Sequence, residues 1–375
     1  MCGGGIITYD HQYIFTDLQP DFAINGEGEE SIVALANYLE KGDDINSIAN
    51  ISYWDNDTPV FTKTAYSNTK LEDLPWPDYS PFDLEAYLEG FNQADNIFTY
   101  TRTRPRIMPI TLGRSCPFKC TFCCHTTGPT YRGRSIDNAI EEIVYFHGKY
   151  HFNLLLVYDE LFSTRKERIT EFCTKIKKVK ADLKTDFDWT CSLRVNNVDK
   201  DVLAEMKDAG CIFIGYGFES ASPTVLKSMK KGITIDQIKR AIKLTDEAGL
   251  GIQANFIFGD IAETPETMHE TLEFFNTWCT DNIVHLGPIV PYPGSKLFEH
   301  CINNGIIKDK KQYYDQIGGV GRYKINMTKM PDEEYFDLSN NIFKITDPLI
   351  HDYLPLKEAK ILSCKQAGLF KFDLN

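Results

Sequence analysis

The sequence has 375 residues, of which 42% are apolar and 25% charged, a balance typical of a globular chain with one large domain or two ordinary ones. The net charge of −13 argues against a general affinity for nucleic acid or for anionic membranes. No apolar run is long enough to span a bilayer and no signal-peptide pattern opens the chain, so we expect a cytoplasmic protein without a membrane span.

The first hundred residues predict small elements of mixed type. The opening stretch, MCGGGIITYD, is typical of the end of a buried strand that runs into a glycine turn. Residues 21–63 then indicate a strand, a glycine loop, a helix and a short β-hairpin. Residues 71–104 contain a proline- and aromatic-rich stretch, which predicts an ordered connector between domains.

From residue 107 onward, six apolar runs alternate with helical patterns. Their nearly continuous apolar character is typical of parallel strands that are buried on both faces. The predicted strands are 107–114, 153–160, 187–194, 211–220, 251–260 and 283–291. Six βα units of about 30 residues predict an α/β fold over 105–305, a parallel barrel or part of one, with functional loops at the carboxyl ends of the strands.

Capping signals place two of the helices between these strands. Thr234 and Gln237 stand in capping-box register, and Thr264 followed by Pro265 predicts a second helix start. Residues 306–375 predict a helical cover at the C-terminal end.

Four of the eleven cysteines lie within residues 116–124, directly after the first predicted strand of the repeat. In a reducing compartment, clustered thiols more often bind metal or do chemistry than form disulfides. Cys116, Cys120 and Cys123 are separated by three residues and then by two. A structural zinc site usually has four ligands in two close pairs, and no second pair follows here. Three thiolates on a cubane cluster leave one iron open to a substrate, so the spacing favours catalysis, with zinc as the alternative.

This spacing, with aromatic Phe122 before the last cysteine, resembles the signature of the radical S-adenosylmethionine (radical SAM) superfamily. The resemblance implies a partial (β/α)6 barrel in which Cys116, Cys120 and Cys123 hold a 4Fe–4S cluster and SAM chelates the fourth iron. In that family an electron, delivered by an external donor of the flavodoxin or ferredoxin type, cleaves SAM. The resulting 5′-deoxyadenosyl radical abstracts hydrogen from a small-molecule substrate. Cys124 is interpreted as structural.

Further motifs resemble the SAM contacts of the family. Asp159 and Glu160, in VYDE, follow the second strand at the place of the acidic motif that meets the SAM amine. The glycines usual there are missing, which leaves open which acid faces SAM. Arg194, in CSLR, would pair with the SAM carboxylate. The alternative is that Glu160 is a helix cap or half of an ion pair, neutralised by Arg194. The remaining implied contacts are Glu219 and Ser220 at the ribose and Ile257, Gly259 and Phe122 at the adenine.

The segments 26–54, 71–87, 131–143 and 217–234 resemble the cobalamin-binding branch of the superfamily. That branch includes methylases of unactivated carbons and the anaerobic magnesium-protoporphyrin monomethyl ester cyclase. The resemblance implies that residues 1–70 are the remnant of a doubly wound cobalamin-binding domain. The residues on its cobalamin side are Gly3, Gly4, Gly5, Gly26 and Glu27.

The Asp-x-His-x-x-Gly loop of that domain is absent from the sequence. The chain is then either a fragment of a longer cobalamin protein, which we favour, or a descendant that has lost the site. We expect weak or no cobalamin binding by this chain.

The reaction that we expect is methylation or cyclisation of an unactivated carbon. The alternatives are another radical SAM reaction, such as epimerisation or methylthiolation, and a non-catalytic metal module. Only Cys2 precedes the triad, whereas methylthiotransferases carry a second cysteine trio upstream.

Overall fold

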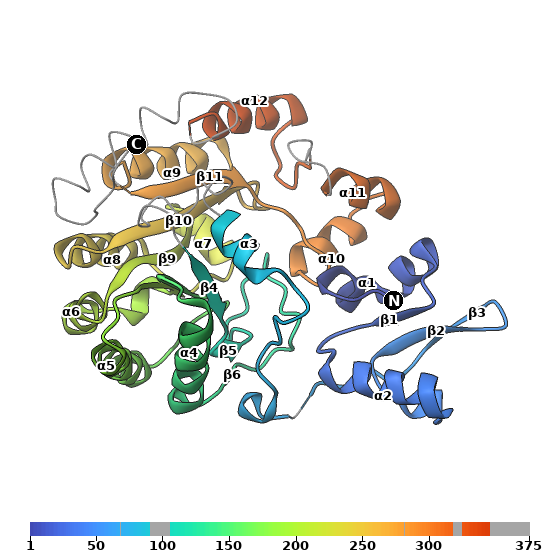
Figure 1. Ribbon diagram of the computed structural model, residues 1–375. Coiled ribbons are helices and arrows are strands. Elements are labelled where there is room, and N and C mark those ends of the chain that lie inside the picture. Colours follow the sequence, from blue (N-terminus) through green and yellow to red (C-terminus); the bar gives the residue numbers. More distant parts are fainter. Residues whose placement is uncertain (68, 91–105, 281, 318–324, 346–375) are drawn as a thin grey trace. The chain divides into compact units, whose positions relative to one another are not determined.

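The computed structural model of the chain describes residues 1–67, 69–90, 106–280, 282–317 and 325–345 (Figure 1). The chain forms two compact units. Unit 1 comprises residues 1–70, 115–132 and 290–322, and unit 2 comprises residues 71–114, 133–289 and 323–375. Parts of the predicted connector (91–104) and of the predicted C-terminal cover (318–324 and 346–375) lie outside the described residues.

A six-stranded parallel sheet is the centre of unit 2, as the apolar runs predict. The spatial order is β11-β10-β9-β8-β7-β4, so consecutive strands of the βα repeat are neighbours. This arrangement confirms the predicted α/β fold with a partial barrel. The strands are β4 (Ile107–Ile110), β7 (Leu154–Val157), β8 (Asp188–Leu193), β9 (Cys211–Glu219), β10 (Gly251–Phe258) and β11 (Ile283–Pro288).

Helices cover one face of this sheet, along its outer side in Figure 1. Strand β10 shows the division: Ala254 and Phe256 are buried in the core beneath the helices, whereas Asn255 is exposed and Ile257 half-buried on the other face. Along β10, that second face is therefore less buried than the face beneath the helices. The helices of the repeat are α4 (Ile136–Tyr150), α5 (Lys166–Leu183), η5 (Val195–Asn197), α6 (Lys200–Asp208), α7 (Pro223–Ser228), α8 (Ile235–Glu247) and α9 (Pro265–Trp278).

Both predicted helix starts are confirmed. The Gln237 N–H donates to Thr234 Oγ1 at 3.3 Å, and Gln237 Oε1 accepts from the Thr234 N–H at 3.0 Å, which completes the capping box of α8. At α9, Thr264 is the N-cap and Pro265 the first helical residue. These caps depend on residues within one turn of each other, which is why the local sequence is enough to place them.

Two further segments of unit 2 flank the repeat in the described part of the chain. After η2 (Leu71–Asp73), the rings of Trp76 and Tyr79 lie 5.5 and 5.3 Å from Tyr145 and Phe146 of α4, and α3 (Leu84–Gly90) follows. Near the C-terminal end, α12 (Asp332–Phe343) packs beside β11 and α9.

Unit 1 contains the three-stranded antiparallel sheet β1-β2-β3. Cys2 forms a parallel bridge with Ala23 of β1, which is the predicted strand end, and a helix rather than an open turn begins at Gly5. The strand, glycine loop, helix and hairpin predicted over 21–63 are confirmed. The elements are α1 (Gly5–Leu18), β1 (Phe22–Ile24), α2 (Glu29–Lys41), η1 (Ile45–Ser47), β2 (Ile51–Asp55), β3 (Thr58–Phe61), α10 (Lys296–Asn303) and α11 (Lys310–Ile317).

Distant parts of the chain meet within unit 1. Lys310 and Tyr314 of α11 both bind the carboxylate of Asp10 in α1, at 2.8 and 2.5 Å. The rings of Phe15 and Trp54 stack at 5.0 Å between α1 and β2. None of the helices within the described ranges is long and apolar enough to cross a membrane.

Candidate functional site: a cysteine loop and the carboxyl ends of the parallel strands

The cysteine loop runs between the two-residue strands β5 (Gly113–Arg114) and β6 (Arg132–Gly133), and its residues 115–132 belong to unit 1. Cys120 is buried, and Cys116 and Cys123 are half-buried. The Cys123 N–H donates to the Cys120 carbonyl at 3.2 Å, which closes a turn between these two ligand candidates. Inside this turn, the carbonyl of Thr121 accepts the Leu297 N–H at 3.1 Å, from the first turn of α10. The loop backbone is therefore held by the rest of unit 1.

The donor set fits an iron–sulfur cluster. Thiolates prefer soft metals, and three of them lie on one short loop. Within the ranges that the structure describes, no three His, Cys, Asp or Glu side chains gather closely enough to hold a single metal ion. A zinc ion needs its sulfur ligands at about 2.3 Å from one point. A cubane cluster instead takes each thiolate on a different iron, so its ligands stand farther apart.

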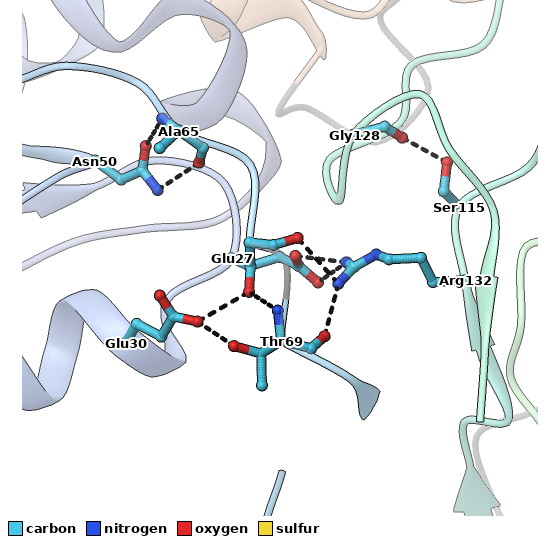
Figure 2. A network of polar contacts seen from close by, with 9 residues as sticks. Glu27, Glu30, Asn50, Ala65, Thr69, Ser115, Gly128 and Arg132 are labelled. Atoms are coloured by element: carbon cyan, nitrogen blue, oxygen red, sulfur yellow. Dashed lines mark hydrogen bonds and ion pairs between the residues drawn. The ribbon is translucent and has the colours of Figure 1, made fainter. Parts of the chain in front are cut away.

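Both ends of the loop are anchored by polar contacts inside unit 1 (Figure 2). Ser115 Oγ donates to the Gly128 carbonyl at 2.5 Å. The guanidinium of Arg132 binds both carboxylate oxygens of Glu27 at 2.5 Å and donates to the Thr69 carbonyl at 3.3 Å. Such charge-assisted contacts restrict both partners. They tie the loop to the segment 27–69.

The predicted cobalamin-side residues lie in the same unit. A Cβ on Gly5 would lie 3.2 Å from Thr126 Cγ2, so the glycine stretch approaches the cysteine loop closely. Gly26, at φ +75°, donates its N–H to Thr8 Oγ1 at 2.9 Å. Glu27 uses its carboxylate to bind Arg132, an anchoring contact that the sequence did not indicate. Gly3 and Gly4 precede α1 directly.

The two acids at the end of β7 differ sharply in environment. Asp159 is 6% exposed, and its Oδ1 accepts the Leu112 N–H at 2.8 Å. Burial raises the pKa of Asp159 to about 7, although the N–H groups of Gly113 and Leu112 and nearby arginines oppose the rise. Glu160, in contrast, is exposed. Of the pair, Glu160 is therefore the one that solvent reaches.

Arg194 and Glu219 belong to one buried polar cluster at the ends of β8 and β9. Arg194 donates from Nη2 to the Lys231 carbonyl, and Lys231 Nζ lies 2.8 Å from Glu219 Oε1. Lys231 was not among the residues predicted from the sequence. A buried carboxylate at a strand end needs a cation within reach, and the nearby Lys-Lys-Gly stretch offered that signal.

Ser220 and the end of β10 are enclosed by protein groups. Ser220 is 1% exposed, lies 3.2 Å from Thr271 Oγ1 and accepts the Ser222 N–H at 3.0 Å. Two positions after Ile257, Gly259 has a left-handed backbone conformation, and a Cβ at this position would clash with Tyr335 Oη.

Glu263 is a second residue that was not predicted from the sequence. Its Oε2 accepts the backbone N–H groups of Gly259 and Asp260, and so closes the turn after β10. Burial raises its pKa to about 8. An acid four residues after a glycine at a strand end was the available signal.

The candidate residues thus fall into two groups. The cysteines and Phe122 belong to unit 1, whereas the other predicted SAM contacts, from Asp159 to Gly259, belong to unit 2 at or near the carboxyl ends of β7 to β10.

Residues 110–275 match the radical SAM superfamily. The chain carries a radical SAM domain. The family implies a 4Fe–4S cluster and SAM as cofactors.

Known proteins resemble the chain beyond this radical SAM domain. An uncharacterised methyltransferase of Pyrococcus horikoshii is 30% identical over 290 residues, which are 76% of this chain and 59% of that protein. The anaerobic magnesium-protoporphyrin IX monomethyl ester cyclase of Rubrivivax gelatinosus is 28% identical over 299 residues, which are 78% of this chain and 51% of the cyclase. These relatives confirm the branch predicted from the sequence. The chain spans little more than half of their length.

A solved structure shows the same fold. The radical SAM methyltransferase TsrM from Kitasatospora setae, with cobalamin and a [4Fe-4S] cluster bound, superposes with a TM-score of 0.64 at 17% identity. The match covers 81% of this chain and 57% of TsrM. At this identity the similarity concerns the fold alone.

Proposed function

We propose that this chain is a radical SAM enzyme in which Cys116, Cys120 and Cys123 bind a 4Fe–4S cluster that leaves one iron to SAM. The observation that carries the proposal is the thiol triad on the loop that follows β4, the first strand of the parallel sheet, within the matched range 110–275. When bound, the cluster would supply the electron for reductive cleavage of SAM to methionine and a 5′-deoxyadenosyl radical. The protein contributes position and the exclusion of water. Flavodoxin or ferredoxin is the class of electron donor that we propose.

For the SAM amine we favour Glu160, because this residue is exposed while the carboxylate of Asp159 already binds Leu112. Arg194, at the end of β8, would pair with the SAM carboxylate. Glu219 sits at the end of β9, where the ribose hydroxyls would be bound. The proposed SAM contacts also include Ser220, Ile257, Gly259 and Phe122.

The proposed reaction is methylation or cyclisation of an unactivated carbon in a small molecule. It is supported by the names of the relatives, a methyltransferase and a cyclase. Because the solved relative TsrM holds cobalamin, we propose cobalamin as a cofactor of the full-length protein, on the side of Gly3, Gly4, Gly5, Gly26 and Glu27.

We propose the matching domain organisation as well. Residues 1–70 would be the remnant of the cobalamin-binding domain and 71–104 the connector. Residues 105–305 would form the barrel and 306–375 its C-terminal cover.

The test is anaerobic reconstitution with iron and sulfide, followed by dithionite and SAM. We expect a brown protein with thiolate-to-iron absorption, and the release of 5′-deoxyadenosine or S-adenosylhomocysteine. Cys120→Ser should lose both the cluster and the products. Cys124→Ser, on the same loop but outside the triad, should keep both.

Two results would contradict the proposal. A well-formed cluster without either product would remove the enzyme claim. A colourless protein with stoichiometric zinc would favour the non-catalytic metal module.

A further inference from the structure

The peptide groups of Leu112 are held from both sides by buried groups of unit 2. The Leu112 N–H donates to Asp159 Oδ1 at 2.8 Å. Its carbonyl accepts the Arg134 N–H at 3.0 Å and a guanidinium N–H of Arg168 at 3.2 Å. The Gly113 N–H also acts to lower the pKa of Asp159, so it stabilises the charged form. Asp159 therefore bonds the Leu112 N–H and interacts electrostatically with the next peptide, just beyond the end of β4.

The groups around Leu112 form a charged network in a dry place. Asp159, Arg134, Arg168 and Glu142 are each less than a tenth exposed. Arg134 forms an ion pair with Glu142, and both arginines act electrostatically on Asp159. Buried charges of this kind rarely stabilise a fold more than apolar residues of the same size would, because their desolvation offsets the attraction.

This network contacts the backbone just before the cysteine loop. Leu112 stands four positions before Cys116, and between them the backbone turns through Ser115, whose φ is +68°. The peptides at Leu112 and Gly113 therefore stand directly before the segment that carries Cys116.

We propose that Asp159 is a positioning residue for the cluster ligand Cys116, acting through the backbone of Leu112 and Gly113 and not through a contact with SAM. The proposal rests on the proposed function, because it requires the cluster to be bound by the triad. Groups that hydrogen-bond a metal ligand typically change metal affinity about 10- to 100-fold when they are removed, and a group that acts through the backbone should have an effect at the lower end of this range.

The environment of Asp159 agrees with this role. Its Oδ1 is occupied by Leu112, and its Oδ2 has no hydrogen-bond partner among the residues that the structure describes. Since its pKa is about 7, the neutral acid and the carboxylate are both accessible states near neutral pH. An asparagine keeps an Oδ1 acceptor for Leu112 and should replace the aspartate well. An alanine removes the acceptor and leaves the buried Leu112 N–H unsatisfied.

The experiment compares Asp159→Ala and Asp159→Asn with Tyr216→Phe as the matched control. Tyr216 is also buried in unit 2, and its hydroxyl lies 3.0 Å from Thr245 Oγ1, away from the network. Iron and sulfide per chain are measured in reconstitutions with limiting iron, together with the electron paramagnetic resonance spectrum of the reduced cluster without SAM. Urea unfolding of the cluster-free chains ranks their stabilities.

We expect Asp159→Ala to bind the cluster about 10-fold more weakly and to shift the resonance signal of the cluster that remains. Asp159→Asn should resemble the unmodified chain in both readouts. Tyr216→Phe should lose stability and keep a normal cluster. Normal iron content and an unchanged signal in Asp159→Ala would overturn the proposal, as would equal iron losses in Asp159→Ala and Tyr216→Phe.

The two proposals fail in distinguishable ways. If the unmodified chain binds a cluster but does not cleave SAM, the proposed function fails, and the comparison of the variants still decides the role of Asp159. If the unmodified chain binds no cluster, both proposals are wrong.

Discussion

The buried pair of Glu219 and Lys231 yields the sharpest quantitative prediction. Lys231 Nζ lies 2.8 Å from Glu219 Oε1, and the side chains of Lys231 and Glu219 are only 9% and 10% exposed. Replacing Lys231 with methionine keeps most of the side-chain volume and removes the charge. The carboxylate of Glu219 is then left in a dry site without its cation. Removing one partner of a buried ion pair typically costs about 3–5 kcal/mol, so we expect Lys231→Met to destabilise the chain by that amount.

A double-mutant cycle separates the pair from the packing. Replacing both charges together often costs little, so Glu219→Gln combined with Lys231→Met should recover most of the stability lost by Lys231→Met alone. The measurement is urea unfolding of the cluster-free chain at pH 7, followed by circular dichroism. Lys296→Met is the control, because Lys296 lies at the same 2.8 Å from Glu299 with both side chains more than half exposed, and it should change the urea midpoint little. If Lys231→Met costs less than about 1 kcal/mol, the pair is solvated and the reasoning fails.

Three further predictions concern the turn after β10 and the anchors of the cysteine loop. Burial raises the pKa of Glu263 from 4.5 to about 8, so the native state keeps a proton that the unfolded state releases between these values. The free energy of unfolding should therefore fall as the pH rises from 4.5 to 8. In Glu263→Gln this fall should be smaller by up to about 4 kcal/mol. Parallel profiles of urea midpoint against pH for the two proteins would refute this. Glu27→Gln weakens the charge-assisted pair with Arg132, so the free energy of unfolding should fall by about 2 kcal/mol, as measured by thermal unfolding. An unchanged melting temperature would show that the pair is dispensable. Gly128→Ala places a Cβ 2.9 Å from the Tyr66 ring at φ +90°, so it should cost about 1–3 kcal/mol, and adding Tyr66→Ala should recover only the steric part.

The fold class and the thiol triad could be predicted from the chain alone. The six parallel strands follow from nearly continuous apolar runs, since a strand buried on both faces needs apolar residues at every position. The start of α8 follows from Thr234 and Gln237, which interact within a single turn. The spacing of the three cysteines is likewise a local property of the chain, so residues 116–123 are enough to indicate the superfamily.

The partners of the candidate site residues depend on contacts between distant segments, which no local pattern encodes. VYDE contains two acids in succession, and only the fold shows that Asp159 is buried against Leu112 while Glu160 is exposed. Glu219 forms its ion pair with Lys231, which follows helix α7 in the chain. Glu27 and Arg132 are 105 residues apart, yet together they anchor the cysteine loop. Burial and long-range pairing determine the pKa and the contacts of a charged side chain, and both arise only when the chain folds.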